Sequence, residues 1–168
     1  DKEVARQMQS LLKRQGIDIK TKAKIQEVRK LQDSAVAVLE GGEEIEADKI
    51  LISIGRVMNL RGLGLEEAGV ALGERGEVAV NDRMETSVPG IYAIGDITGR
   101  IQLAHVASAQ GLVAVDNIMG RGRIMDYRVV PACIFTHPEV GSVGITSQEA
   151  ENSGVKIEKM IGKVCTMP

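Results

Sequence analysis

One short stretch constrains the fold of this chain more than any other part of its sequence. Residues 91–94 form an apolar run that is bounded by Pro89-Gly90 before it and by Gly95-Asp96 after it. Such a run between turn residues is typical of a buried strand in a parallel sheet. Gly95 allows a sharp turn, and Asp96 places a carboxylate at the carboxyl end of the strand, where open α/β sheets bind their ligands.

A helix is predicted to begin near Leu103, after a short polar loop. Its first turn, at Leu103, Ala104 and His105, carries backbone N–H groups without an acceptor inside the helix, together with the positive end of the helix dipole. The hydroxyl-binding carboxylate of Asp96 and this anion-stabilising helix start are expected to face one crevice. Such a crevice suits a cofactor that has a sugar-like chain and develops negative charge.

A second apolar run, residues 50–54, is also expected to be a parallel strand that is buried on both faces. It ends at Gly55, which allows the backbone to approach a ligand closely at the carboxyl end of the strand. An ordinary glycine between strand and loop explains the same residue. In the same way, Asp96 taken alone is explained by a turn in which its side chain satisfies backbone amides.

The other segments predict smaller elements. A helix is expected from Asp1, as the capping residue, to Gln15, followed by a short strand and an antiparallel meander. The runs that form the strand and the meander lie roughly at residues 17–31, 35–39 and 44–47. From residue 127 onward the pattern is strand, strand, helix and a last extended segment at 155–164, with a capping box from Thr146 to Glu149. This order is typical of the opening of an α+β domain.

Composition excludes several classes of partner. The formal net charge is −2 and charges of both signs are interspersed, so we expect neither nucleic acid nor a membrane surface as a partner. Cys133 and Cys165 form neither a CxxC nor a CxxxxC pair and have no metal-ligand spacing, which indicates unpaired cysteines in a reducing compartment and no metal site. The sequence contains no apolar run of membrane-spanning length.

Four groups of motifs follow one another along the chain. They are Ile54-Gly55-Arg56 with Leu63-Gly64-Leu65 and Ala68-Gly69-Val70; the stretch from Thr86 to Asp96; Leu103-Ala104-His105 with Ala109-Gln110-Gly111; and the stretch from Phe135 to Val140 with Val143-Gly144. In this order they resemble the flavin-dependent pyridine-nucleotide disulfide oxidoreductases, and the resemblance covers essentially the whole chain. Within that family, His105 and the Thr136–Glu139 motif make the chain most similar to the dihydrolipoamide dehydrogenases. Met58 is a departure, since the family usually has proline there.

This resemblance implies an α/β fold that is an excerpt of three domains. Residues 1–54 would be the C-terminal part of an NAD-binding domain with the antiparallel meander. Residues 55–126 would be the second segment of an FAD-binding domain, and residues 127–168 the incomplete beginning of an α+β dimerisation domain. The chain would therefore be an internal fragment of a longer protein, called the parent below.

The resemblance also implies what the parent does and which residues bind its cofactors. The parent would oxidise dihydrolipoamide to lipoamide, with hydride transfer through FAD to NAD. Asp96, held by the turn at Gly95, would bind ribityl hydroxyls of FAD, and the backbone N–H groups at residues 103–105 would face the pyrimidine edge of the flavin. Gly55 would line the NAD site.

Several functional motifs of the family do not occur in this sequence. They are the FAD and NAD fingerprints, the redox-active CxxxxC pair and the C-terminal His-Pro with its following glutamate. His137-Pro138 is not that pair, because Ser142 stands where the glutamate would be. We therefore expect no catalytic residue in this chain and no dehydrogenase activity from these residues alone.

The expected parent is a homodimer of the cytoplasm or an organelle matrix. It would act on dihydrolipoyl groups of a 2-oxo acid dehydrogenase or glycine cleavage complex. Two alternatives remain open at this point. The parent could be another member of the family, such as a mercuric or glutathione-type reductase or an NADH oxidase. Alternatively, the chain could be a stand-alone, non-catalytic module that binds flavin or a partner.

Overall fold

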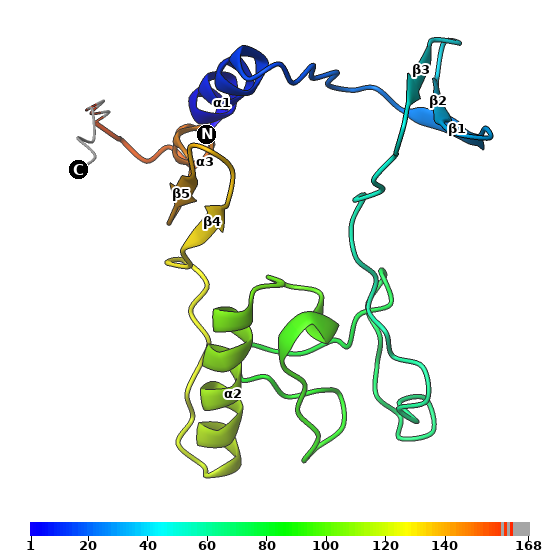
Figure 1. Ribbon diagram of the computed structural model, residues 1–168. Coiled ribbons are helices and arrows are strands. Elements are labelled where there is room, and N and C mark those ends of the chain that lie inside the picture. Colours follow the sequence, from blue (N-terminus) through cyan, green and yellow to red (C-terminus); the bar gives the residue numbers. More distant parts are fainter. Residues whose placement is uncertain (159, 161, 163–168) are drawn as a thin grey trace. The chain divides into compact units, whose positions relative to one another are not determined.

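The computed structural model describes residues 1–158, 160 and 162. The chain divides into two compact units, which are residues 56–145 on one side and residues 1–55 with the described residues from 146 onward on the other. Along the chain, one helix is followed by three antiparallel strands, a 3₁₀-helix, a longer helix, two antiparallel strands and a last short helix (Figure 1). None of the helices in this described part is long and apolar enough to cross a membrane.

The first unit contains two helices that are joined near their N-termini. Helix α1 spans Lys2–Arg14, as predicted within one residue. The carboxylate of Asp1 does not cap α1 as expected, because its Oδ1 accepts a hydrogen bond of 3.1 Å from the backbone N–H of Ser147. Ser147 is the first residue of α3 (Ser147–Asn152), where Thr146 and Glu149 form the predicted capping box.

The first unit also contains the predicted meander. Strands β1 (Ile25–Lys30), β2 (Ala35–Leu39) and β3 (Glu44–Ala47) pair antiparallel in the order β1-β2-β3. The central strand β2 is the buried one, since Val36, Ala37 and Leu39 lie within it and are each less than a tenth exposed. Both outer strands carry polar residues, as expected for a sheet with a solvated surface.

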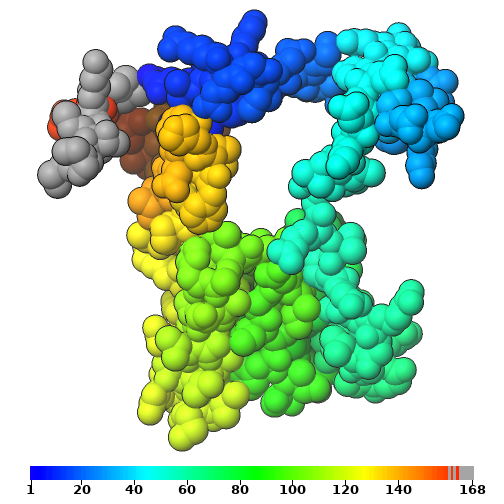
Figure 2. Space-filling view, in the orientation of Figure 1, coloured from blue at the N-terminus to red at the C-terminus, as the bar shows by residue number. Residues whose placement is uncertain are grey.

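The second unit holds the stretch that constrains the fold. Its elements are the 3₁₀-helix η1 (Gly95–Thr98), helix α2 (Ala104–Ile118), and the antiparallel pair β4 (Ala132–Ile134) and β5 (Val140–Ser142). Helix α2 begins one residue after the predicted start and packs against η1. Side chains close the space between α2 and residues 80–100 in the space-filling view (Figure 2).

The two expected parallel strands are not formed in the part of the chain that the structure describes. Residues 50–54 have no strand partner, and Leu51 and Ile54 are about nine-tenths exposed. In residues 91–94 only Ala93 is buried, and Tyr92 makes a single antiparallel bridge to Glu85. A strand needs a neighbour to satisfy its backbone N–H and C=O groups, and the described residues supply no parallel neighbour for either run. The described residues of the segment 155–164 also form no strand, and its other residues lie outside the described part.

A small core fixes the second unit around Met84. Its side chain is fully buried against Val113 and Ala114 of α2. The carbonyl oxygen of Met84 accepts a hydrogen bond of 3.1 Å from the N–H of Ala93. Met84 therefore ties α2 to the segment that leads into Gly95.

Replacing Met84 by Ala is expected to lower the free energy of unfolding by about 3 kcal/mol, because truncation of a buried Met removes apolar contacts and leaves a cavity. Alanine keeps a Cβ, so the left-handed backbone at this position (φ +67°) is strained equally in both proteins. The measurement is equilibrium urea unfolding. The matched control is Met119→Ala, which removes the same atoms from a side chain that is 66% exposed and should change little. Equal effects of the two substitutions would contradict this account of the core.

Charged residues close the turn after α2. The carboxylate of Asp116 accepts hydrogen bonds from Arg123 (3.0 Å) and Arg121 (2.7 Å). These hydrogen bonds, from Arg123 first and then Arg121, lower the pKa of the Asp116 carboxyl below its usual value. A carboxyl with a lowered pKa stabilises the fold above its ordinary titration range and loses that contribution as the pH falls through its lower folded-state value.

The variant with Arg121→Gln and Arg123→Gln is therefore expected to bring the pKa of Asp116 back up toward the usual range of an aspartate. NMR titration of the carboxyl carbons measures this shift. Asp126 is the internal control, since Arg128 holds the pKa of its carboxyl at about 2 by side-chain hydrogen bonds first and a backbone hydrogen bond second. An unchanged Asp116 titration in the double variant would show that the two arginines do not set its pKa.

Candidate cofactor site

The turn that presents Asp96 is held on both sides of Gly95. Gly95 has a φ of +79°, a left-handed conformation that favours glycine. Its N–H donates a hydrogen bond of 2.6 Å to Oε1 of Gln110, and its carbonyl oxygen accepts one of 2.8 Å from Oγ1 of Thr98. Both side chains are buried. These two hydrogen bonds therefore hold the next residue, Asp96, in place.

The Asp96 carboxylate is open to a ligand. Its side chain is 45% exposed, and a guanidinium nitrogen of Arg56 lies 3.7 Å from Oδ2. Among the described residues this ion pair is the one contact found for the carboxylate. Ion pairs of this length at a solvated surface are worth little, so hydroxyl groups of a ligand can take their place.

The start of α2 offers two of the three predicted N–H donors. The N–H of Leu103 is not available, because it donates a hydrogen bond of 3.0 Å to the carbonyl oxygen of Ile101. For Ala104 and His105, no acceptor of their backbone N–H groups is found among the described residues. Both residues are exposed, so their N–H groups lie at the open, positive end of the helix dipole.

The ring of His105 has a different role from its backbone. Its Nε2 lies 2.9 Å from the carbonyl oxygen of Pro131, just before β4. Because a carbonyl oxygen only accepts, Nε2 carries a proton in this contact. The ring therefore ties the start of α2 to the beginning of β4, and the free backbone N–H is what His105 offers to a ligand.

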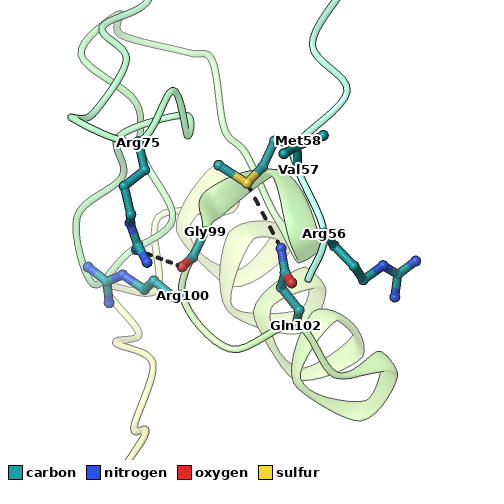
Figure 3. Close-up of a pocket in the computed structure, with 7 residues that line it drawn as sticks. All are labelled: Arg56, Val57, Met58, Arg75, Gly99, Arg100 and Gln102. Atoms are coloured by element: carbon teal, nitrogen blue, oxygen red, sulfur yellow. Dashed lines mark hydrogen bonds between the residues drawn. The ribbon is translucent and has the colours of Figure 1, made fainter. Parts of the chain in front are cut away.

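A pocket of about 370 Å³ adjoins the loop between η1 and α2 (Figure 3). It is lined by Arg56, Val57, Met58, Arg75, Gly99, Arg100 and Gln102. The thioether of Met58 faces the amide of Gln102 at 3.9 Å, while Arg75 and Arg100 lie on the side opposite to Arg56 (Figure 3). Its three charged lining residues are arginines, and each pairs with a carboxylate outside the lining, namely Asp96, Glu77 and Asp82.

Gly55 belongs to the first unit, whereas the other predicted site residues lie in the second. Its φ of +130° again lies in a region that favours glycine, and a Cβ at this position would meet no atom within 4 Å. Its assignment to an NAD site stays a prediction. The structure does bring together Gly95, Asp96, Ala104 and His105, through η1 and α2.

Comparison with known proteins gives the family. Residues 1–111 match the pyridine nucleotide-disulphide oxidoreductase family, which is more than half of the chain. The chain belongs to the pyridine nucleotide-disulphide oxidoreductases. Residues 130–166 match the dimerisation domain of the same family. The fold class and the family resemblance inferred from the motifs are thereby confirmed, and the family uses FAD and NAD.

Individual members of the family agree with this assignment. The chain is 42% identical to a dihydrolipoyl dehydrogenase of Chlamydia pneumoniae, over 99% of this chain and 37% of that protein. It is 43% identical to a dihydrolipoyl dehydrogenase of Thermus scotoductus, over 97% of this chain and 36% of that protein. The chain thus spans little more than a third of these relatives.

Two solved structures are similar to this chain in fold. LpdA of Mycobacterium tuberculosis superimposes with a TM-score of 0.86 at 31% identity, over 92% of this chain and 34% of LpdA. RclA of Escherichia coli, described as an HOCl-induced flavoprotein disulfide reductase, gives a TM-score of 0.83 at 29% identity, over 92% of this chain and 35% of RclA.

Gln110 is a residue of this site that the sequence interpretation did not single out beyond its motif. It lies on the buried face of α2 between Val106 and Val113, at helical spacing, and is fully buried. A polar amide on an otherwise apolar stripe is the signal that could have identified it, because a buried amide needs hydrogen-bond partners.

Proposed function

We propose that this chain supplies the second FAD-binding segment and the start of the dimer interface of an NAD-linked dihydrolipoamide dehydrogenase. The observation that carries the proposal is the pairing, within one unit, of an open carboxylate at Asp96 with the free N–H groups of Ala104 and His105. The relatives named dihydrolipoyl dehydrogenase, which match nearly the whole chain, support this branch of the family.

The described residues fit FAD. The Asp96 carboxylate accepts hydrogen bonds from ribityl hydroxyls. The N–H groups of Ala104 and His105, with the dipole of α2, stabilise negative charge at the pyrimidine edge of the flavin. FAD, when bound, supplies the ring that carries two electrons between dithiol and nicotinamide. The protein's part is to fix that ring against these donors.

In the proposed reaction, dihydrolipoamide loses two electrons and two protons and forms its disulfide. NAD takes up a hydride, and one proton is released. The parent is proposed to be a homodimer, which the match of residues 130–166 to a dimerisation domain supports. Its proposed location is the cytoplasm or an organelle matrix. Its proposed substrates are dihydrolipoyl groups of a 2-oxo acid dehydrogenase or glycine cleavage complex.

A second candidate is another disulfide reductase of the same family. The likeness to RclA, described as a flavoprotein disulfide reductase, favours it. The flavin contacts proposed for Asp96 are the same in both cases. The two candidates differ in the substrate that delivers or receives the electrons, so a substrate assay separates them.

The test is a chimeric enzyme. Residues 1–168 replace the matching segment of the Thermus scotoductus dihydrolipoyl dehydrogenase, to which this chain is 43% identical. The proposal predicts a yellow, dimeric protein with one FAD per subunit and lipoamide-dependent interconversion of NAD and NADH. A folded dimer without FAD would contradict the flavin-binding role, and bound FAD without lipoamide activity would contradict the assignment to the dihydrolipoamide branch.

A further inference from the structure

The side chain of Gln110 joins the two halves of the candidate flavin site. It projects from α2, yet its Oε1 accepts the hydrogen bond from the N–H of Gly95 at 2.6 Å. Gly95 precedes Asp96 directly, and α2 begins six residues before Gln110, at Ala104. One hydrogen bond thus connects the loop that presents the carboxylate to the helix that presents the free N–H groups.

The other end of the same amide is also fixed. Nε2 of Gln110 donates a hydrogen bond of 2.9 Å to the hydroxyl of Tyr127. The Tyr127 ring lies under the guanidinium of Arg100, 5.0 Å from the ring centroid, and Arg100 donates a hydrogen bond of 2.9 Å to Asp82. The Gln110 amide therefore cannot rotate without breaking a contact at each end.

Because Gln110 is buried, losing one of its hydrogen bonds is costly. Its side chain is fully excluded from solvent, so water cannot replace a lost partner. Gly95 itself is half-buried, so its N–H pays part of a desolvation cost when it loses this acceptor. The turn at Gly95 would then move to find another acceptor, and the Asp96 carboxylate would move with it.

We propose that Gln110 is a positioning residue of the flavin site, which sets the separation between the Asp96 carboxylate and the N-terminus of α2. This inference rests on the proposed flavin-binding function. It deepens that function by naming a residue that touches no cofactor and acts through Gly95.

The experiment is a double-mutant cycle in the FAD-loaded chimeric enzyme, with the dissociation constant of FAD as the readout. Gln110→Leu is expected to raise this constant about tenfold. If Gln110 acts through Asp96, then the factor by which Asp96→Ala raises the dissociation constant of FAD is about tenfold smaller in the Gln110→Leu background than in the unsubstituted enzyme. The reason is that the carboxylate is already displaced in Gln110→Leu. Equal costs in both backgrounds would overturn the inference, as would unchanged binding in Gln110→Leu.

Two further variants separate positioning from a loss of folding. In Gln110→Glu, burial favours the protonated acid, which can accept from the N–H of Gly95 and donate to the Tyr127 hydroxyl as the amide does. FAD binding should then return to within about threefold of the unsubstituted enzyme, and binding as weak as in Gln110→Leu would contradict the inference. Asn117→Leu is the matched control, since Asn117 lies two turns further along α2. Its side-chain N–H groups donate hydrogen bonds to the carbonyl oxygens of Arg83, Val113 and Arg123. This substitution should lower the melting temperature and leave the cost of Asp96→Ala unchanged. If Asn117→Leu reduced the effect of Asp96→Ala on FAD binding as far as Gln110→Leu does, the effect would come from a general loosening of α2, and the inference would be overturned.

The cycle also distinguishes failure of this inference from failure of the proposed function. If the unsubstituted chimera holds no FAD, the proposed function fails. If it holds FAD and loses it with Asp96→Ala, while the cycle is additive, the inference about Gln110 fails alone.

Discussion

The purified 168-residue chain is expected to produce no NADH from dihydrolipoamide and NAD, even with FAD added. A dithiol must be oxidised by a disulfide held next to the flavin, and the only cysteines, Cys133 and Cys165, are 32 residues apart rather than in a CxxxxC pair. Cys133 is an exposed free thiol in β4. We also expect no active-site base, since Ser142 stands where the family's glutamate would follow His137-Pro138.

The assay follows NADH formation at saturating dihydrolipoamide, with the chimeric enzyme as positive control. We expect no NADH formation by the isolated chain, because without the redox-active disulfide it has no route by which to oxidise the dithiol. We also expect weak or absent FAD binding, since the glycine-rich FAD fingerprint of the family, which would bind the phosphates, does not occur in these residues. Lipoamide-dependent NADH production by the isolated chain would refute the first expectation, and tight stoichiometric flavin retention would refute the second.

Replacing Asp96 by Ala in the chimeric enzyme is expected to raise the dissociation constant of FAD about 100-fold, which corresponds to about 2.7 kcal/mol. A carboxylate that accepts hydrogen bonds from ligand hydroxyls makes charge-assisted bonds, which are stronger than neutral ones. Asp96→Asn keeps an acceptor but loses the charge, so its effect should be smaller, about tenfold. FAD fluorescence during titration of the apoprotein measures both constants.

The matched control for Asp96→Asn is Asp116→Asn. It removes the same charge from α2, where the carboxylate bonds Arg121 and Arg123 rather than facing the site. FAD affinity should stay at the level of the unsubstituted enzyme. Equal losses from both aspartates would mean that net charge, and not the position of the Asp96 carboxylate, governs flavin binding.

Features that depend on local sequence could be predicted. Periodicity, turn residues and cap chemistry predict the start of α2 near Leu103, the meander at 25–47 and the capping box at Thr146. Each of these signals involves residues that are only a few positions apart in the sequence. The turn at Gly95, which exposes the Asp96 carboxylate, also follows from a local turn residue, while the flavin-binding role of that carboxylate stays a prediction. These interactions involve neighbours in sequence, which a pattern can show.

Features that depend on distant partners could not be predicted. An apolar run such as 50–54 becomes a strand only beside another strand, and the described residues provide none. The hydrogen bond from Gly95 to Gln110 joins residues 15 apart through a side chain, so no spacing rule shows it. The N–H of Leu103 was expected to be free, and a turn bond to Ile101 occupies it.

The most direct test of the central claim is a crystal structure of the chimeric enzyme with FAD bound. The account predicts a carboxylate oxygen of Asp96 within hydrogen-bonding distance of a ribityl hydroxyl, and the N–H groups of Ala104 and His105 at the pyrimidine edge of the flavin. A flavin whose ribityl chain lies out of reach of Asp96 would contradict the account, and so would a pyrimidine edge held by other groups.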